Sequence, residues 1–581
     1  MDRVKIFQVI IITIVIAIVV RLAYWQFVSD IASENRGISR EITLPSTRGE
    51  IYASDNFPLA TNQEAYILYA RPRDIKEDSV NIAKKIAPYF ISEKFATLEG
   101  QISQEDEKLK KIEIENEEKR ISEQLRSVKL SWVQIARKVT KNTKIQIQKL
   151  NVSGLGFERD SKRYYPEASM SAHVLGFVGL DKYGEDTGYF GLEGNYNTLL
   201  KGKPGRIGQE QDPNGFPILV GKYRPVEPKK GNSIVTSIDR TIQFIVEKKL
   251  QESVEKYGAK QGTVIVSEPT TGKILAMATY PSYNPNNFSD FSEALYKNPA
   301  VADTYEPGST FKLITMSAAI DLSLVSPSSQ CSVCSGPRQI GGFEISTWNK
   351  KYYPNSTMTE VIQHSDNIGM TFVSDKLGID KFKNYIEKFG LGKATGIDLQ
   401  EESPGVIRQS SDWRPIDLAT ASFGQGLAVT PIQMVQAVQA IANGGKMNSP
   451  TIAQKIINEN GDEKIIASRQ QQVIAPKTAA QITEMMVNAV EKGEAKAFAP
   501  KGYRIAGKTG TAQIPVAGHY DPNKTIASFI GFAPANEPKF VMLVRFTEPT
   551  SSIFGSETAA PTFFSIAKEI FSYKAISPNE K

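Results

Sequence analysis

Three short motifs in this chain carry the residue types that serine acyl transfer needs. The first is Ser309-Thr-Phe-Lys312, with serine and lysine three positions apart, and on a helix two such residues are neighbours. A serine hydroxyl becomes a nucleophile when a base is held within hydrogen-bond distance. Lysine can be that base when burial and nearby positive charge lower its pKa. Pro307-Gly308 should end the preceding segment, so that a helix begins at Ser309 and its N-terminus favours negative charge there.

The spacing of serine and lysine alone is weak evidence. Ser253-Val-Glu-Lys256 and Ser565-Ile-Ala-Lys568 fit it equally well, and such matches arise by chance in a chain of 581 residues. What distinguishes Ser309 must therefore come from other parts of the sequence.

The second motif, Ser365-Asp366-Asn367, can serve the same reaction. The Ser365 hydroxyl can relay a proton toward a leaving amine, and the Asn367 amide can hold a substrate backbone. The same triplet recurs at 54–56, where we expect only a turn.

The third motif, Lys508-Thr509-Gly510-Thr511, falls in a predicted strand. Lys508 and Thr509 can bind a substrate carboxylate, and Gly510 leaves room for a ligand beside the strand edge. The backbone N–H groups of Ser309 and Thr511 would then form an oxyanion hole. The order Ser-x-x-Lys, Ser-x-Asn, Lys-Thr-Gly along the chain is that of a known catalytic set.

The elements around these motifs predict an α+β domain that begins at Gly231. Apolar runs at 263–267 and 274–278, joined by Pro-Thr-Thr-Gly, indicate a β-hairpin. Three more strands are expected far downstream, at 503–514, 525–532 and 539–546. Between these two blocks the chain is mostly helical, for example at Pro431–Ala442. This pattern favours one antiparallel sheet closed by distant segments, with helices packed on it.

The N-terminus carries one candidate membrane span. Residues 6–20 are almost entirely apolar, and residues 22–28 continue the span, with Arg21 able to extend its charge to the interface. The interfacial aromatic belt would consist of Tyr24, Trp25 and Phe27. A cleavable signal peptide is the alternative, although no clear small-x-small cleavage site follows the apolar run.

Residues 29–230 have a different character. Gly and Tyr punctuate residues 163–206, which favours short strands and turns over helices. The stretch 92–130 is dense in Glu, Lys and Gln and has apolar residues at helical spacing, namely Leu109, Ile112, Ile121, Leu125 and Val128. A solvated amphipathic helix or hairpin is favoured there over a partner-binding coiled coil. Residues 212–230, rich in Pro, Gly and Lys, look like a connection into the next domain.

Composition and charge narrow the functional classes. The net charge of +6 is a small difference between 69 basic and 63 acidic residues, which gives no argument for nucleic acid as a partner. Two cysteines, Cys331 and Cys334, and three scattered histidines do not make a four-ligand zinc site, and we predict neither a metal nor another cofactor. The cysteines can form a small-loop disulfide if the domain is exported, or remain as two thiols.

With its three motifs in this order, the sequence resembles the class B penicillin-binding proteins, the monofunctional D,D-transpeptidases of peptidoglycan, over nearly its whole length. Further motifs that carry the resemblance are Arg48-Gly-x-Ile51, Arg163-Tyr-Tyr-Pro166, His173-x-x-Gly176, Gly191-x-Glu193, Tyr280-Pro-Ser-Tyr-Asn-Pro285, Gly424-Gln-Gly426 and Phe529-Ile-Gly-Phe-Ala-Pro534. The resemblance implies the penicillin-binding transpeptidase fold, a five-stranded antiparallel sheet with helices packed on it, preceded by a strand-rich pedestal domain. It also implies that a stem peptide ending in D-Ala-D-Ala acylates Ser309 with loss of the terminal D-Ala. The acyl group then passes to an amine on a neighbouring strand, and β-lactams acylate the same serine.

The resemblance also suggests how the chain is divided. Residues 1–28 would be a short cytoplasmic tail and anchor, 29–230 the pedestal or dimerisation-type domain with its charged insertion at about 92–130, 231–575 the transpeptidase domain, and 576–581 a tail. The implied location is the cytoplasmic membrane, with a single span and the catalytic domain outside the cytoplasm.

Two features bear on the subclass. The stretches 419–431 and 559–563 look more like the division-type, FtsI-like members than the elongation type, and proteins of the division or elongation complex are the implied partners. One departure is that Ser-Asp-Asn at 54–56 stands where the family often has Arg-Asn-Gly.

Other functions would use the same three motifs. A D,D-carboxypeptidase or a β-lactamase would deacylate Ser309 with water, but the anchor and the long segment before Gly231 favour a transpeptidase. A non-catalytic sensor of β-lactams should carry a cytoplasmic effector, and the few residues before Ile6 are too short for one.

Overall fold

The computed structural model describes residues 3–24, 38–95, 104–127, 130–211, 224–516 and 519–578. Trp25, Phe27, Val128 and residues 212–223, which belong to features predicted above, lie outside the described residues. The chain forms two compact units. One comprises Met1–Arg48 with Gly202–Gly231, and the other comprises Gly49–Lys201 with Asn232–Lys581.

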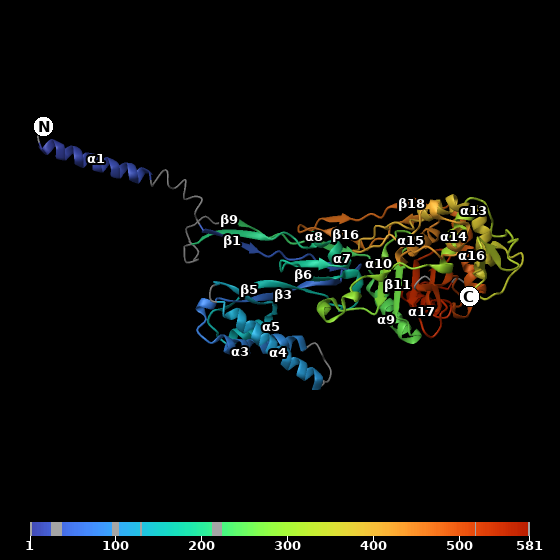
Figure 1. Cartoon of the computed structure of the whole chain (residues 1–581), viewed down its shortest axis with the longest axis horizontal. Helices are drawn as coiled ribbons and strands as arrows, with labels where there is room; N and C mark the ends of the chain where they lie inside the picture. The colour runs from blue at the N-terminus through green and yellow to red at the C-terminus, as the bar shows by residue number, and fades with distance from the viewer. Residues whose placement is uncertain are drawn as a thin grey trace. The chain divides into compact units, whose positions relative to one another are not determined.

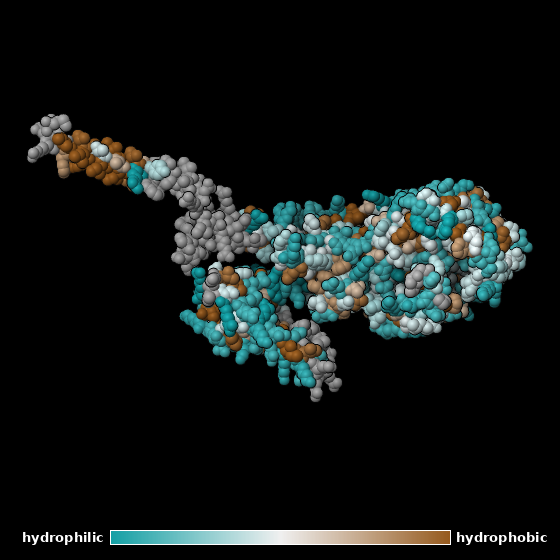
Figure 2. Space-filling model, viewed as in Figure 1, coloured by the Kyte–Doolittle hydropathy of each residue, from teal (hydrophilic) through white to brown (hydrophobic). Residues whose placement is uncertain are grey.

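The first unit contains the apolar helix α1 (Arg3–Ala23) and a small antiparallel sheet. Within α1, Ile6–Ala23 is the one segment of the described chain that is long and apolar enough to cross a membrane, and none of it is buried. Figure 2 shows the apolar side chains on the face of this helix that is in view. The sheet has the order β1 (Ile38–Leu44), β8 (Gly205–Gln211), β9 (Arg224–Val226). Within the segment 212–230, which was expected to be a connection into the next domain, the described residues include the short strand β9, which pairs with β8.

The second unit contains the predicted five-stranded antiparallel sheet, in the order β12-β11-β21-β20-β19. Its strands are β11 (Gln261–Ser267), β12 (Ile274–Tyr280), β19 (Ala506–Val516), β20 (His519–Ala533) and β21 (Phe540–Thr547). The sequence thus predicted the fold class and all five strands, although β20 begins earlier than expected.

Helices cover both faces of this sheet (Figure 1). Helices α9 (Arg240–Tyr257) and α17 (Ala559–Tyr573) pack on one face. The other face contributes to the large core that contains the helices of the middle segment. These are α10 (Pro299–Ala302), α11 (Lys312–Asp321), α12 (Met358–Gln363), α13 (Asn367–Lys388), α14 (Pro415–Ser422), α15 (Pro431–Ala442) and α16 (Pro476–Lys492). Helix α15 has the bounds that its sequence predicted.

A second sheet of this unit has the order β17-β16-β10-β2-β3-β4, with β5 also paired to β3. Its strands are β2 (Ile51–Tyr52), β3 (Pro58–Ala70), β4 (Val133–Thr140), β5 (Leu155–Tyr164), β10 (Ser233–Thr236), β16 (Ala453–Ile457) and β17 (Glu463–Ile465). Three two-stranded sheets complete the unit: β6 (Phe177–Leu180) with β7 (Asp186–Tyr189), β13 (Arg338–Ile340) with β14 (Phe343–Ile345), and β15 (Lys446–Asn448) with β18 (Gln470–Gln472).

The charged insertion is helical, as predicted. Helices α3 (Ser79–Phe95) and α4 (Gln104–Leu125) pack together and share a small core with α5 (Lys141–Lys149). Ile121 of α4 is fully buried there, whereas Leu109 and Ile112 are about half exposed. The apolar stripe of α4 is therefore covered at one end only.

Residues 163–206 contain more helix than their sequence suggested. Three short helices occur there, α6 (Ala172–Leu175), α7 (Gly191–Asn195) and α8 (Asn197–Leu200). The prediction of strands and turns alone was wrong because the glycines lie at the ends of these single turns and do not interrupt them. Gly176 caps the C-terminus of α6 at φ +74°, and Gly191 is the first residue of α7 at φ +47°.

Motifs that are far apart in the sequence meet at the buried ion pair of Arg163 and Glu193. The Nε of Arg163 lies 2.6 Å from Oε1 of Glu193, and Nη1 of Arg163 donates to the Gly49 carbonyl at 2.8 Å. The Tyr165 hydroxyl donates to the same carboxylate at 3.3 Å. Removal of either member of a buried ion pair leaves the charge of the other without compensation and destabilises the fold. Replacement of Arg163 or of Glu193 alone is therefore expected to destabilise this part of the protein.

The Ser-Asp-Asn triplet at 54–56 is a turn, as expected. Asn56 has φ +63° and donates its N–H to the Ala53 carbonyl at 3.0 Å. Asparagine tolerates this left-handed conformation better than most residues, so the turn forms without the family's glycine.

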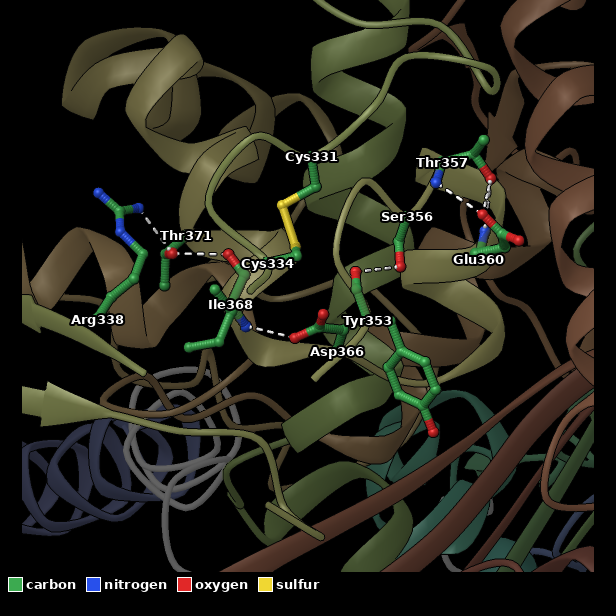
Figure 3. Close-up of a disulfide and its surroundings, with 10 residues drawn as sticks. All are labelled: Cys331, Cys334, Arg338, Tyr353, Ser356, Thr357, Glu360, Asp366, Ile368 and Thr371. Atoms are coloured by element: carbon green, nitrogen blue, oxygen red, sulfur yellow. Dashed lines mark hydrogen bonds between the residues drawn. A yellow bond between two sulfur atoms is a disulfide. The ribbon is translucent and has the colours of Figure 1, made fainter. Parts of the chain in front are cut away.

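Cys331 and Cys334 form a disulfide, which decides between the two alternatives that the sequence left open. Both cysteines are fully buried, and the Cys331 N–H donates to the Ser356 carbonyl at 2.8 Å. Figure 3 shows the disulfide in the part of the domain that also holds Asp366 and Ile368 at the start of α13.

Candidate active site

Ser309 lies in a single 3-10 turn, Gly308–Phe311, and α11 begins only at Lys312. The helix was expected to begin at Ser309 itself, whereas Ser309 lies in the 3-10 turn that leads into α11. This turn begins at Gly308, whose φ is +55°. Gly308 donates its N–H to the Gly424 carbonyl at 3.0 Å. Gly424 has φ +84°, and a Cβ there would lie 2.2 Å from the Gly308 oxygen. Only glycine at 424 permits this approach, so the Gly-Gln-Gly motif positions the turn that carries Ser309.

Strand β19 lies directly against this turn. A Cβ at Gly510 would lie 2.5 Å from Oγ of Ser528, 2.9 Å from Cγ2 of Thr310 and 3.1 Å from the Pro307 oxygen. The side-chain position of Gly510 is therefore filled by the protein itself. The glycine makes room for the turn that carries Ser309, rather than for the ligand that the sequence suggested.

Lys312 is fully buried, and its Nζ donates to the carbonyl of Ser365 at 2.6 Å and to Oδ1 of Asn367 at 2.8 Å. No hydrogen bond joins it to the Ser309 hydroxyl in the described structure, although both residues lie on adjacent turns. Burial, and then the charge of Lys508, lower the pKa of Lys312 well below its usual range, and Asp366 partly opposes this effect. The environment therefore favours a neutral amine.

The Ser365 hydroxyl lies between the two lysines. Its Oγ is 3.3 Å from Nζ of Lys312 and 3.0 Å from Nζ of Lys508. Ser365 has φ +55°, an unfavourable conformation for serine. The surrounding structure maintains this strained backbone conformation, which places the Ser365 hydroxyl between the amino groups of Lys312 and Lys508.

Asp366, the middle residue of the motif, caps helix α13. Its Oδ1 accepts the Ile368 N–H at 2.7 Å, while the buried Oδ2 has no hydrogen-bond partner among the described residues. Burial raises the pKa of Asp366, and the charge of Lys312 opposes that rise. The cap sets where α13 begins and hence where Asn367 projects.

Lys508 is also buried, and its Nζ lies 3.3 Å from both the carbonyl and the hydroxyl oxygen of Thr509. Burial lowers its pKa from the ordinary 10.5 to about 8, against the opposing charge of Glu494. Near neutral pH Lys508 remains largely protonated, so it can bind an anion.

Thr511 lies beside the residue that precedes the serine. A Cβ on Gly308 would be 3.0 Å from the Thr511 carbonyl oxygen and 3.3 Å from Cβ of Ala512. The Thr511 hydroxyl accepts the N–H of Gly555 at 3.1 Å. The turn that carries Ser309 therefore lies against β19 at Thr511.

A cavity of about 320 Å³ opens over these residues. It is lined by Gly308, Ser309, Trp348, Ser365, Asn367, Phe423, Gln425, Glu494, Thr509, Thr511, Gln513, Thr525, Ile553 and Phe554. The structure thus brings five of the eight predicted side chains or backbones, those of Ser309, Ser365, Asn367, Thr509 and Thr511, to one cavity. Lys312 and Lys508 lie directly behind its wall, in contact with Ser365, and Gly510 lies against the Ser309 turn.

Several lining residues were not predicted. Trp348 and Phe554 approach each other with ring centroids 5.5 Å apart in an edge-to-face arrangement, and Glu494 follows the C-terminus of α16. None of them belongs to a motif, and they come together only through the fold. Gln425 lies inside the quoted Gly424-Gln-Gly426 motif, which was the one available signal.

Comparisons with known proteins identify the family of this chain. Residues 262–572 match the family of the penicillin binding protein transpeptidase domain, and residues 43–236 match the penicillin-binding protein dimerisation domain. The chain therefore belongs to the penicillin-binding protein transpeptidases, and it is a serine-type D,D-transpeptidase with an N-terminal dimerisation-type domain.

Individual relatives cover almost the whole chain. The stage V sporulation protein D of Bacillus subtilis is 32% identical over 572 residues, which are 96% of this chain and 84% of that protein. The peptidoglycan D,D-transpeptidase FtsI of Escherichia coli is 28% identical over 96% of this chain and 90% of that protein. Among solved structures, a peptidoglycan synthetase from Bifidobacterium adolescentis is 25% identical, covers 94% of this chain and 98% of its own, and superposes with a TM-score of 0.73. Penicillin binding protein 3 from Mycobacterium tuberculosis, in complex with aztreonam, shares the fold at 24% identity over 93% of this chain and 99% of its own, with a TM-score of 0.68.

Proposed function

We propose that Ser309 is the nucleophile that cross-links peptidoglycan stem peptides, with Lys312 as its base. The supporting observation is the full burial of Lys312 beside a second buried lysine. A neutral amine keeps two N–H donors for the two short contacts to Ser365 and Asn367. Its lone pair then remains free to accept the proton of the Ser309 hydroxyl.

The acylation step follows from these roles. The Ser309 oxygen attacks the carbonyl carbon between the two terminal D-Ala residues, an ester bond forms, and the peptide bond breaks. Ser365, which contacts both lysines, relays a proton to the leaving amine of D-Ala. The backbone N–H groups of Ser309 and Thr511 stabilise the oxyanion, and Asn367 holds the peptide backbone of the donor.

The carboxylate of the terminal D-Ala is bound by Lys508 and Thr509. The positive charge of Lys508 near neutral pH supports this role, since its pKa is about 8. β-Lactams place a carboxylate and a reactive carbonyl in the same relation, so they acylate Ser309 in the manner of the donor.

The protein is proposed to act at the outer face of the cytoplasmic membrane, anchored by α1, with residues 231–575 as the catalytic domain and the preceding segment as the pedestal. We assign it to septal wall synthesis with proteins of the division complex. The 28% identity to a protein named FtsI over nearly the whole chain, and the FtsI-like stretches at 419–431 and 559–563, support this assignment.

A sporulation role is the second candidate, because the relative at 32% identity is named stage V sporulation protein D. Depletion of the protein in its host separates the two. Filamentous cells with incomplete septa are expected for the septal role. Normal division with a defect confined to spore formation would contradict the septal role and favour the sporulation role.

Covalent labelling with a fluorescent penicillin tests the nucleophile. The full chain in detergent should label, Ser309→Ala should lose all label, and Ser565→Ala should label like the parent. Covalent label on Ser309→Ala would show that another residue is the nucleophile.

A further inference from the structure

The cavity above Ser309 has an uneven distribution of charge. Of the residues that line it, Glu494 alone carries a formal charge, since Lys312 and Lys508 lie behind the wall. The Glu494 side chain is exposed and forms no ion pair with any residue that the structure describes. It follows Gly493, the residue that ends α16, whose N–H donates to the Ala489 carbonyl at 3.1 Å. A negative group thus stands at the rim of a cavity whose other polar groups are neutral.

Glu494 lies near the reacting groups, because it lines the same cavity as Ser365 and Thr509 and also lines a smaller adjoining pocket together with Lys508 and Thr509. Its charge also opposes the fall in the pKa of Lys312 and Lys508 that burial causes. In the proposed function, the leaving D-Ala departs from this end of the cavity, and the acceptor enters there.

The donor and the acceptor of the proposed reaction carry opposite charges at this end of the cavity. The donor ends in a carboxylate, which Lys508 attracts and Glu494 repels. The acceptor is an ammonium ion, which Glu494 attracts and Lys508 repels. We propose that Glu494 determines the specificity of the second half-reaction by binding the cationic amine of the acceptor at the cavity rim. This inference rests on the proposed function, in which an acyl group on Ser309 passes to an amine.

Transfer of the acyl group from Ser309 to the acceptor takes place in two stages. The bound ammonium ion loses one proton to water and becomes an amine. Its nitrogen forms an amide bond to the acyl carbon, the ester bond to the Ser309 oxygen breaks, and the second nitrogen proton ends on that oxygen. Glu494 holds the ammonium ion before the first proton is lost and takes no part in the bond changes.

Partition of one acyl-enzyme between two amines tests the proposal. The full chain in detergent is acylated with a D-alanyl thioester, and D-alaninamide, which is cationic, competes with methoxyamine, which is uncharged at neutral pH. Because both products form from the same acyl-enzyme, any change in the acylation rate cancels in their ratio. Glu494→Gln is expected to lower the ratio of D-alaninamide to methoxyamine product about fivefold, as for a solvent-exposed ion pair.

Two further variants sharpen the result. Glu494→Asp keeps the charge and should restore most of the ratio, and Glu491→Gln, an exposed carboxylate one turn earlier that does not line the cavity, should leave it unchanged. An unchanged ratio in Glu494→Gln, or an equal fall in Glu491→Gln, would overturn the proposal. Failure of the parent chain to form any acyl-enzyme on Ser309 would instead contradict the proposed function.

Discussion

The start of α11, together with the turn before it, and helix α17 have the same serine–lysine spacing and differ in nearly everything around it. In α11, Lys312 is fully buried and donates to two residues of another motif. In α17, Lys568 is exposed to solvent, although Ser565 is half-buried like Ser309. The buried face of α17 is made instead by apolar residues that pack on the five-stranded sheet. The spacing is the same, but the environment of the lysine is opposite.

The third copy of the spacing, in α9, resembles α17. Lys256 is exposed, with its Nζ 5.0 Å from the centre of the Tyr257 ring. Ser253 accepts a hydrogen bond from the Thr562 hydroxyl at 3.0 Å, which joins α9 to α17. Serine and lysine three positions apart are therefore common, whereas a desolvated lysine among hydrogen-bond acceptors is what favours a neutral amine.

The largest expected effect separates the buried lysine from the exposed one. Lys312→Met should lower the rate of acylation by a fluorescent penicillin about 10³-fold, because the base is lost, while Lys568→Met should leave the rate unchanged. Stopped-time labelling of the full chain, followed on a gel, measures both. Methionine occupies a similar volume, and an unchanged melting temperature would verify the fold.

Acylation of Lys312→Met by the fluorescent penicillin at the rate of the parent protein would contradict this explanation. A desolvated lysine would then not be what distinguishes the Ser309 motif from the copy in α17, and the base would be one of the other polar groups around Ser309.

The sequence could predict what is carried by a motif or a periodic pattern. Ser309, Lys312, Ser365 and Lys508 could be proposed as site residues because the order of their motifs along the chain is specific, and the structure brings them together. The five strands could be predicted because their apolar runs are strong. The 3-10 turn at Gly308 was not predicted, because it depends on the backbone contact with Gly424, more than a hundred residues away.

Residues that act through position alone could not be predicted either. Glu494 is one of many acidic residues, and Trp348 is an exposed aromatic residue on a loop. Nothing in their local sequence distinguishes them from solvated side chains. Only the packing of α16 on β19 and the ring contact of Trp348 with Phe554 bring them to the cavity.

A smaller effect concerns the stability cost of a buried lysine. The pKa of Lys508 is about 8 in the folded protein and 10.5 ordinarily, so between these values the unfolded chain binds a proton that the folded chain does not. Stability should therefore rise with pH across this window, by about 3 kcal/mol for the full shift. Lys508→Met should flatten the increase in melting temperature between pH 8 and pH 10, and Lys568→Met should not.

If the melting temperature of Lys508→Met rose between pH 8 and pH 10 as much as that of the parent protein, Lys508 would not be desolvated in the folded protein. The contrast between buried and exposed lysines would then rest on Lys312 alone.

The smallest expected effect concerns the serine of α9. Ser253→Ala removes one of the two oxygens that the single proton of the Thr562 hydroxyl can reach, and the Thr558 carbonyl at 3.0 Å remains as its acceptor. The expected cost is about 1 kcal/mol of stability, read as a small fall in melting temperature, with penicillin labelling unchanged. Thr562→Val removes the donor instead, and the two variants combined should cost little more than the larger single change, since both delete the same bond. A loss of labelling in Ser253→Ala would contradict the structural role of this serine and would show that the contrast between the three copies of the motif is not one of environment alone.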